Sequence, residues 1–528
     1  MDRISEPLFV IAALVVFAAA AVIIYVYLKR KEQKEAFDEI VENTGKLFEE
    51  RKSSKALQGH QSILEKINKK NNPLLYAQVS HRIGISYRRL AEEADNEKNL
   101  TMAIESYEEA LSVYTGSAVG TMPNGERQSD EYALIWFDIG NAFWALSELK
   151  DEQVNIQKAV NAYEHVLKIY NMENNSVKYG TVQNSLGLAY WELSVLSNKE
   201  ENLSKAAAAY EEAIKSGTFD KYPDDCAEIN HNIGLVLWEL SSLRDKEENL
   251  TKAAAFTEAS IGLITLDKDP VRYAIAQDHL AGIYDNLSEV ADNKAENLIK
   301  AAAAYEEALK VRTPGEYPIE YAILKNSMGN TFGALTDSGG SEVYMMKAVA
   351  AFKDALKIYI PEDFPKDYAM TMNNLGNAYA LLSEKQETEG NLKLAVYAFK
   401  EALKIYSPEE FPLEYYFTQS NMGDAFLALS EVCDKEENLM KAARSYEKAL
   451  KIEVIKQFPF KYAQTQYNLG VACHVLSNMQ NKKENLNKAA YALEKAMGIY
   501  TPEDNHMRYA EIKNRLDIIL QSLTLTGQ

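Results

Sequence analysis

The sequence predicts an all-α fold in which antiparallel helix pairs stack into a solenoid, preceded by one transmembrane helix. A glycine recurs along most of the chain at intervals of 47 residues, and a fixed period of this size indicates a repeat array in which each unit packs on its neighbours. Near the N-terminus, residues 8–28 carry no charge and are mostly apolar, and about 20 such residues are enough to cross a bilayer. These two observations set the expected domain organisation.

Composition narrows the class of partner. The 528 residues carry a formal net charge of −20, and 47% of them are hydrophobic. We therefore expect a packed structure. We do not expect nucleic acid as a partner, because no basic stripe offsets the repulsion of the phosphates. The three cysteines are scattered without pair spacing, which is typical of a reducing compartment.

The N-terminal segment divides into a short tail, residues 1–7, and the apolar run of residues 8–28. A cleaved signal peptide is the alternative to a retained anchor. The leader, however, holds Asp2 and Glu6 against a single basic residue, Arg3, and no polar cleavage zone follows the small residues of the run. The basic flank KRKEQK then places the large domain on the inner side. We expect a single-pass membrane protein with the bulk of its chain in the cytoplasm.

The recurring glycine, called the repeat glycine below, defines nine units within residues 73–500. A juxtamembrane basic segment and a degenerate leading repeat are expected in residues 29–72, and a capping helix with a tail in residues 501–528. Atypical units at both ends are how a solenoid usually terminates. The repeat glycine, replaced by alanine in the fifth unit, stands at Gly84, Gly140, Gly187, Gly234, Ala281, Gly329, Gly376, Gly423 and Gly470.

Each unit is expected to consist of two helices, and the repeat glycine lies in the first. An apolar residue directly precedes the glycine, a residue that is aromatic in most units follows it by three positions, and a leucine follows it by six. Steps of three and four positions lie on one side of an α-helix, so these residues predict the core face of the first helix. The leucines are Leu90, Leu146, Leu193, Leu240, Leu287, Leu335, Leu382, Leu429 and Leu476.

The second helix of each unit follows a polar loop such as SNKEEN. Small residues and an aromatic stand inside it, as in Ala206 and Tyr210, and prolines such as Pro361 and Pro365 mark its exit, because proline cannot continue a helix. In most units an asparagine stands where this helix is expected to begin, so it is predicted to be the N-cap residue. These asparagines are Asn99, Asn202, Asn249, Asn297, Asn391, Asn438 and Asn485.

These residues resemble the tetratricopeptide repeat. The stretch WFDIGNAF, residues 136–143, matches the pattern W-x2-L-G-x2-Y in kind, and Ala206 with Tyr210 matches A-x3-F. The usual unit has about 34 residues. The longer units here are similar to the long-loop repeats of kinesin light chain and of many microbial arrays, over residues 36–525. The resemblance implies a right-handed superhelix whose concave groove, lined by the first helices, holds extended peptides or partner helices.

One stripe of the first helix varies among the units. Its positions lie three before, one after and four after the repeat glycine, roughly opposite the core face, and the resemblance implies that they line the groove. Units two to four place Trp144, Trp191 and Trp238 there, and unit two adds Phe137 and Asn141. These residues predict an aromatic patch that anchors bulky side chains of a protein or peptide partner. Packing against a neighbouring unit is the alternative for the tryptophans.

Units six and seven place asparagine pairs on this stripe, Asn326 with Asn330 and Asn373 with Asn377. Because each amide offers donors and an acceptor, the pairs predict hydrogen bonds to a bound peptide backbone. The resemblance implies the same, since asparagines one residue past the glycine make such bonds in peptide-binding family members. A solvated or loop-capping role is the alternative. Only Arg88 is basic on the stripe, so we do not expect a clamp for acidic tails.

No chemistry-bearing motif accompanies the repeats. The seven histidines form no HExxH pair, and the sequence holds no nucleotide-binding, nucleophile-elbow or Cys/His metal spacing. We therefore expect no catalytic residue, no cofactor and no metal. The sequence predicts a membrane-anchored, non-catalytic scaffold that binds protein or peptide partners in its groove. The alternatives are a chaperone-like accessory factor for membrane-protein insertion or complex assembly, and a structural membrane-tethered spacer. The sequence identifies neither the partner nor the oligomeric state.

Overall fold

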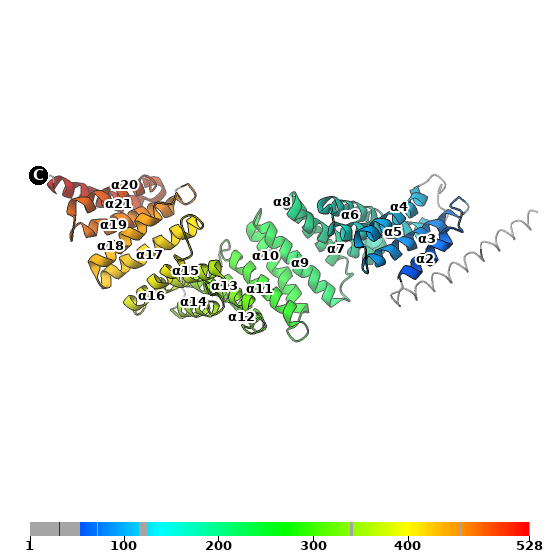
Figure 1. The fold of residues 1–528 in the computed structure, drawn as a ribbon, viewed down its shortest axis with the longest axis horizontal. Coiled ribbons are helices and arrows are strands. Elements are labelled where there is room, and N and C mark those ends of the chain that lie inside the picture. The colour runs from blue at the N-terminus through cyan, green and yellow to red at the C-terminus, as the bar shows by residue number, and fades with distance from the viewer. Residues whose placement is uncertain are drawn as a thin grey trace, which may run out of the picture. The chain divides into compact units, whose positions relative to one another are not determined.

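The computed structural model describes residues 31, 53–70, 72–115, 125–337, 342–453 and 456–526. Every regular element in these ranges is an α-helix (Figure 1), which confirms the predicted all-α repeat fold. The predicted transmembrane helix, residues 8–28, lies outside the described residues. Within them, no helix combines the length and the apolar character that crossing a bilayer requires.

The chain forms two compact units, Met1–Leu243 and Arg244–Gln528, called unit 1 and unit 2 below. The described helices of unit 1 are α2 (Ser53–Leu64), α3 (Pro73–Ala91), α4 (Asn96–Thr115), α5 (Gly125–Ser147), α6 (Glu152–Leu167), α7 (Met172–Leu196), α8 (Lys199–Lys215) and α9 (Pro223–Ser241). Those of unit 2 are α10 (Lys246–Leu263), α11 (Pro270–Leu287), α12 (Lys294–Ala308), α13 (Pro318–Asp337), α14 (Glu342–Ala355), α15 (Pro365–Leu382), α16 (Thr388–Ala402), α17 (Pro412–Val432), α18 (Lys435–Ala449), α19 (Pro459–Leu476), α20 (Lys482–Met497) and α21 (Pro502–Thr526).

Helices that follow one another in sequence pack together within each unit. The pairs α3–α4, α5–α6 and α7–α8 in unit 1, and α11–α12 to α19–α20 in unit 2, share the most extensive contacts, and each second helix also packs on the first helix of the next pair. First helices of successive pairs touch directly as well, as α13, α15, α17 and α19 do. The first helices α13, α15, α17 and α19 therefore line one continuous face of unit 2.

The predicted core face of the first helix is confirmed. The leucine six positions after the repeat glycine is buried from Leu146 to Leu476, and only Leu90, in the first pair, is half-buried. The apolar residue before the glycine is buried in every one of the nine repeats, from Ile83 to Leu469. Removal of these side chains from water is the main force that pairs the helices.

At the repeat glycine, a side chain of the second helix packs closely on the first helix. A Cβ added to Gly376 would stand 2.6 Å from Cε1 of Phe399, and a Cβ added to Gly187 would stand 2.6 Å from Cδ1 of Tyr210. Both distances are far below van der Waals contact. The glycine therefore allows an aromatic ring of the second helix to lie directly on the backbone of the first.

The second helices do not begin at the predicted N-cap asparagines. Helix α8 begins at Lys199, after Asn198, which is left-handed with a φ of 45°. Asn202 stands one turn inside the helix, where it is buried, and its Nδ2 donates to the carbonyl oxygen of Ser197 at 2.7 Å. The N-cap prediction is thus wrong, because this asparagine instead satisfies a carbonyl at the end of the preceding turn. The same bond to the carbonyl five residues back is made by Asn99, Asn155, Asn249, Asn391, Asn438 and Asn485.

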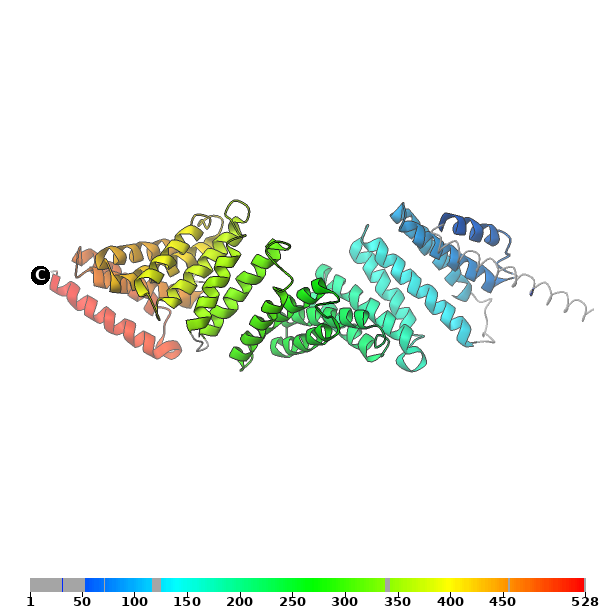
Figure 2. The ribbon, with the colours of Figure 1, turned by 90° about the horizontal axis from the view of Figure 1, so that it is seen from below.

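Proline starts most of the first helices in unit 2, since α11, α13, α15, α17 and α19 all begin at one. Proline suits this position, because the first turn of a helix leaves its N–H groups without intrahelical partners. At the C-terminal end of unit 2, α21 packs on α20 and buries Ile512, Leu516 and Ile519 (red in Figure 2).

Candidate functional site

Hydrogen bonds cross from one first helix to the next along the predicted stripe of unit 2. Asn326 Oδ1 in α13 accepts from the Thr371 hydroxyl in α15 at 3.2 Å, and Asn373 Oδ1 accepts from the Thr418 hydroxyl in α17 at 3.0 Å. Each threonine is 45 residues beyond its asparagine, so the same bond recurs at two successive repeats. Asn326 is only 7% exposed. Its carboxamide therefore joins adjacent repeats. This role is neither the predicted hydrogen bond to a peptide backbone nor the alternative of a solvated or loop-capping side chain.

A second row of bonds runs parallel to the first, one helical turn further along. Asn421 Nδ2 in α17 donates to Asn377 Oδ1 in α15 at 2.9 Å. In the next repeat Asn468 Nδ2 in α19 donates to Asp424 Oδ1 in α17 at 2.7 Å. Asn330, the counterpart of Asn377 one repeat earlier, is exposed on α13. This row lies closer to solvent than the first, because Asn377, Asn421 and Asp424 are all half-buried or exposed.

Four members of these rows, Asn373, Asn377, Asn421 and Asp424, line a hollow of about 690 Å³ in unit 2. The hollow spans α15, α16, α17 and the start of α19. The structure brings two of the four predicted asparagines, Asn373 and Asn377, into it, whereas Asn326 and Asn330 are not part of its lining. The polar lining is Asn373, Asn377, Ser383, Glu384, Asn421, Asp424 and Lys461, and the apolar lining is Ala380, Leu381, Leu392, Phe399, Phe417, Ala425 and Ala428.

Asp424 is the residue in this hollow that sequence reasoning missed. It follows the repeat glycine Gly423 directly, so it occupies the position of Asn377, and that shared position was the available signal. Its Oδ1 accepts from both the Tyr446 hydroxyl, at 2.6 Å, and Asn468. The surrounding protein raises the pKa of the Asp424 carboxyl above its usual range, although these two hydrogen bonds and the charge of Lys461 oppose the rise. The carboxylate nevertheless remains open to solvent through the mouth of the hollow.

The three tryptophans predicted to form an aromatic patch are half-buried, Trp144 on α5, Trp191 on α7 and Trp238 on α9. Trp191 Nε1 donates to Glu239 Oε1 in α9 at 3.0 Å, and the same carboxylate lies 3.4 Å from the Lys199 ammonium in α8. The Trp191 indole is thus fixed by the neighbouring repeat while part of its surface stays open. Trp191 therefore both packs against a neighbouring repeat and keeps part of its surface exposed, so it combines the two interpretations given for the tryptophans.

Phe137 and Asn141 both contact the second-helix ring of their own pair. The Phe137 and Tyr163 ring centroids are 5.7 Å apart, and the Tyr163 hydroxyl donates to Asn141 Oδ1 at 2.8 Å. The Asn141 side-chain carbonyl therefore already accepts a hydrogen bond, as the asparagine carbonyls of unit 2 do. Phe137 also lines a small apolar pocket of about 130 Å³ between α5, α6 and α7.

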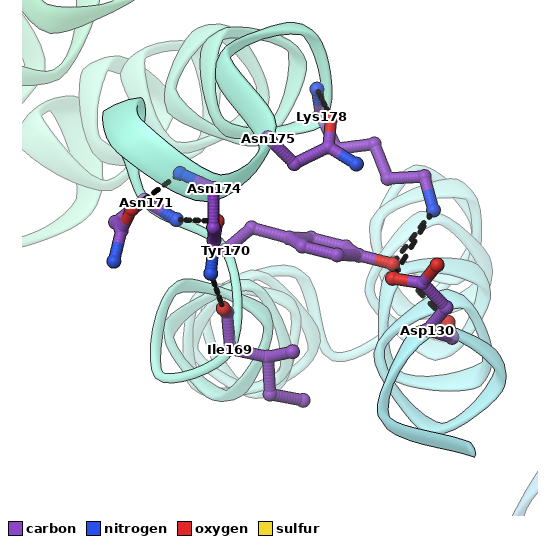
Figure 3. A network of polar contacts seen from close by, with 7 residues as sticks. All are labelled: Asp130, Ile169, Tyr170, Asn171, Asn174, Asn175 and Lys178. Atoms are coloured by element: carbon purple, nitrogen blue, oxygen red, sulfur yellow. Dashed lines mark hydrogen bonds and ion pairs between the residues drawn. The ribbon is translucent and has the colours of Figure 1, made fainter. Parts of the chain in front are cut away.

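Polar groups border this small pocket at the α6–α7 junction (Figure 3). The Lys178 ammonium donates to the Tyr170 hydroxyl at 2.7 Å and lies 3.7 Å from Asp130 Oδ1. An Asn171–Asn174 capping box starts α7 beside them. These side chains hydrogen-bond or pair with one another, so they stabilise the α6–α7 junction at the edge of the pocket.

Comparisons with known proteins give matches of fold. No protein-family model and no curated protein matches the sequence. Among solved structures, the chain is similar to the C-terminal part of a TPR repeat-containing protein from Cytophaga hutchinsonii, with 14% identity and a TM-score of 0.37 over 58% of this chain and 95% of that one. It is similar to BtubC (BKLC) from P. vanneervenii, with 21% identity and a TM-score of 0.33 over 48% and 92%. It is also similar to the apo form of RapI, with 13% identity and a TM-score of 0.39 over 79% and 97%.

The described helices form a tetratricopeptide-like repeat array. Antiparallel pairs follow one another within each unit, a small residue stands where the two helices touch, and a ring or leucine of the second helix packs on it. The resemblance of the sequence to this class of repeat is thereby confirmed.

Proposed function

We propose that this chain is a membrane-anchored, non-catalytic scaffold that binds protein or peptide partners on the face formed by its first helices. The observation that supports it best is the hollow of about 690 Å³ in unit 2, where amides, two carboxylates and the half-buried ring of Phe417 share one surface. A few convergent polar groups in a mainly apolar concavity are typical of a binding site. The half-buried tryptophans of unit 1 would supply a second, more apolar contact.

The amides of the hollow are suited to an extended chain. Asn377 and Asn421 each use one polar atom in the bond between them. The Asn377 Nδ2 group and the Asn421 carbonyl are left for a ligand, and a peptide backbone offers an acceptor and a donor of the same kind. Carboxamides held by an inter-repeat bond lose little conformational entropy when they bind.

Affinity capture from the native membrane tests the proposal. We expect partners to be lost from two variants of the full-length chain, one with Trp144, Trp191 and Trp238 changed to alanine and one with Asn330 and Asn377 changed to alanine. A matched control changes Tyr397 and Tyr491, which are more than half exposed on second helices, to alanine. If both groove variants keep the partners of the unaltered chain, including when Asn326 and Asn373 are also replaced, the proposal is wrong.

The membrane anchor rests on the apolar run of residues 8–28 and on the basic residues that follow it. Carbonate extraction should leave the chain in the membrane pellet, and deletion of residues 8–28 should release it. For the cytoplasmic side, Cys433 serves as the reporter in a chain with Cys226 and Cys473 changed to alanine. An impermeant maleimide should label Cys433 only after the membrane is opened, and labelling of intact cells would reverse the assigned topology.

A further inference from the structure

One carboxylate oxygen of Asp424 accepts no hydrogen bond from the described residues. Both of its hydrogen bonds, from Tyr446 and from Asn468, end on Oδ1, and among the described residues no partner is bonded to Oδ2. Tyr446 belongs to α18 and is fully buried, and Asn468 belongs to α19. Two other helices therefore fix the orientation of this side chain before any ligand arrives, which is how a binding group is preorganised.

The surroundings of Asp424 favour a positive charge. Its carboxylate and that of Glu384 both line the hollow, so a cation placed beside them would gain a favourable interaction. Lys461 lines the same hollow and its charge already acts on Asp424, but among the described residues no ion pair within 4.0 Å joins the two side chains. The net charge of −20 adds a long-range attraction for a basic segment.

The remaining lining suits a long side chain with a charged end. Phe417 and Leu381, both half-buried, offer aromatic and apolar surface along the hollow, and Asn421 keeps a carbonyl oxygen as a second acceptor in the same lining as Asp424. Arginine matches this arrangement better than lysine, because its planar guanidinium carries five N–H donors and stacks on aromatic rings, while its stem is apolar.

We infer that the hollow of unit 2 receives the side chain of an arginine from an extended partner segment, with Asp424 Oδ2 and the Asn421 carbonyl accepting from the guanidinium. This assignment rests on the proposed function, because it names the partner chemistry of the same groove. The partner segment is a separate basic peptide chain, recognised by one arginine flanked by residues that contact the Asn377 amide.

Peptide libraries bound to the full-length chain test this assignment. Three libraries of nine-residue peptides are randomised except at the centre, which is fixed as arginine, as citrulline or as glutamate. Citrulline keeps the shape of arginine without its charge. We expect the arginine library to be retained about tenfold more than the citrulline library. A charge-assisted hydrogen bond contributes about 1.5 kcal/mol or more, and about 1.4 kcal/mol corresponds to a tenfold change in affinity.

The Asp424→Asn variant supplies the critical comparison. Its amide oxygen can still accept from Tyr446 and Asn468, so the hollow keeps its geometry while the charge is removed. We expect this variant to retain the arginine and citrulline libraries equally, and we expect the control Asp363→Asn, at an exposed loop residue, to keep the tenfold preference. Equal retention by the unaltered chain, or a preference that survives Asp424→Asn, would overturn the arginine assignment.

The same libraries separate this inference from the proposed function. Retention that ignores the central residue, and that is lost when Asn377 and Asn421 are changed to alanine, overturns the arginine assignment and leaves peptide binding in the groove standing. Retention of none of the three libraries counts against both.

Discussion

The Tyr446 hydroxyl in α18 donates to Asp424 Oδ1 in α17 at 2.6 Å, so the second helix of this pair reaches the groove face of the first. The approach is possible because Gly423 has no side chain: a Cβ there would lie 2.5 Å from Cε1 of Tyr446. Tyr163 reaches Asn141 past Gly140 in the same way. The repeat glycine therefore connects the core of a pair with the chemistry of the groove.

Loss of the Tyr446 hydroxyl should weaken this pair. Tyr446→Phe keeps the ring, as Phe399 does one repeat earlier, but leaves Asp424 Oδ1 with one bond fewer. We expect a local loss of about 1.5 kcal/mol or more, the usual value for a bond to a charged group. Amide hydrogen exchange in α17 and α18 should therefore become at least about tenfold faster.

Tyr210→Phe is the matched control for that change. The Tyr210 hydroxyl is buried and has no hydrogen-bond partner among the described residues. Its removal relieves an unsatisfied polar group, so exchange in α7 and α8 should stay the same or become slower. Equal acceleration by both variants would show that the hydroxyl–carboxylate bond is not the cause.

Two glycines one turn apart in α13 should respond to alanine with opposite signs. At Gly329 an added Cβ would lie 2.6 Å from Cε1 of Phe352, whereas at Gly333 no atom comes within 4 Å. Gly329→Ala should destabilise the pair by about 1–3 kcal/mol through overpacking. Gly333→Ala should stabilise it by roughly 0.5–1 kcal/mol, because alanine is the better helix former. Thermal unfolding followed by circular dichroism checks both, and a shift of the same sign contradicts the contact described.

Glu387 carries backbone strain that its counterparts avoid. It has a φ of 44° before α16, where other repeats place aspartate or asparagine, such as Asp434 and Asn481. Only glycine, asparagine and aspartate adopt this conformation readily, and other residues lose about 1–2 kcal/mol. Glu387→Asn should therefore raise the stability of α16 in hydrogen exchange by about 1 kcal/mol. Glu387→Gln, which keeps the strain, should not; an equal gain from glutamine would point to charge as the cause.

The Asp285 carboxyl should make unit 2 less stable as pH rises. Burial raises the pKa of Asp285 to about 6, although hydrogen bonds from Thr331 and Tyr305 oppose the rise. The folded state then binds more protons than the unfolded state between about pH 4 and pH 6, so the free energy of unfolding falls across that range. Above it, Asp285→Asn should be more stable than the unaltered chain by roughly 3 kcal/mol, and below pH 4 the two should be similar. Melting temperatures of both chains from pH 4 to pH 7.5 measure the difference, and a constant difference would contradict the shift.

The core of the array was predictable because one residue type recurs at one position. Leu146 and its seven later counterparts show the burial that the helical spacing indicates. The start of the second helix was not, because asparagine favours an N-cap and also suits a buried side chain that bonds a turn carbonyl. The helix begins just after a left-handed residue that stands four positions before this asparagine, as Asn198 stands before Asn202. An asparagine at that earlier position was the available sign in the sequence.

The candidate site was only partly predictable, for a geometric reason. The spacing placed Asn373 and Asn377 on one stripe, and both line the hollow. Spacing within a helix carries no information about bonds between helices 45 residues apart, so it did not separate Asn326, which is buried in such a bond, from the others. Asp424 was not predicted, because a single carboxylate at this position does not belong to an asparagine pair.

Photo-crosslinking tests most directly whether partners occupy the groove face. Benzoylphenylalanine placed at Ala428, an exposed residue of the hollow, is compared with the same group at Tyr397, which is 56% exposed on the second helix α16. Irradiation of native membranes should give partner adducts from position 428, and few or none from position 397. Adducts that form at position 397 as readily as at position 428, or that form at 397 alone, would contradict the account.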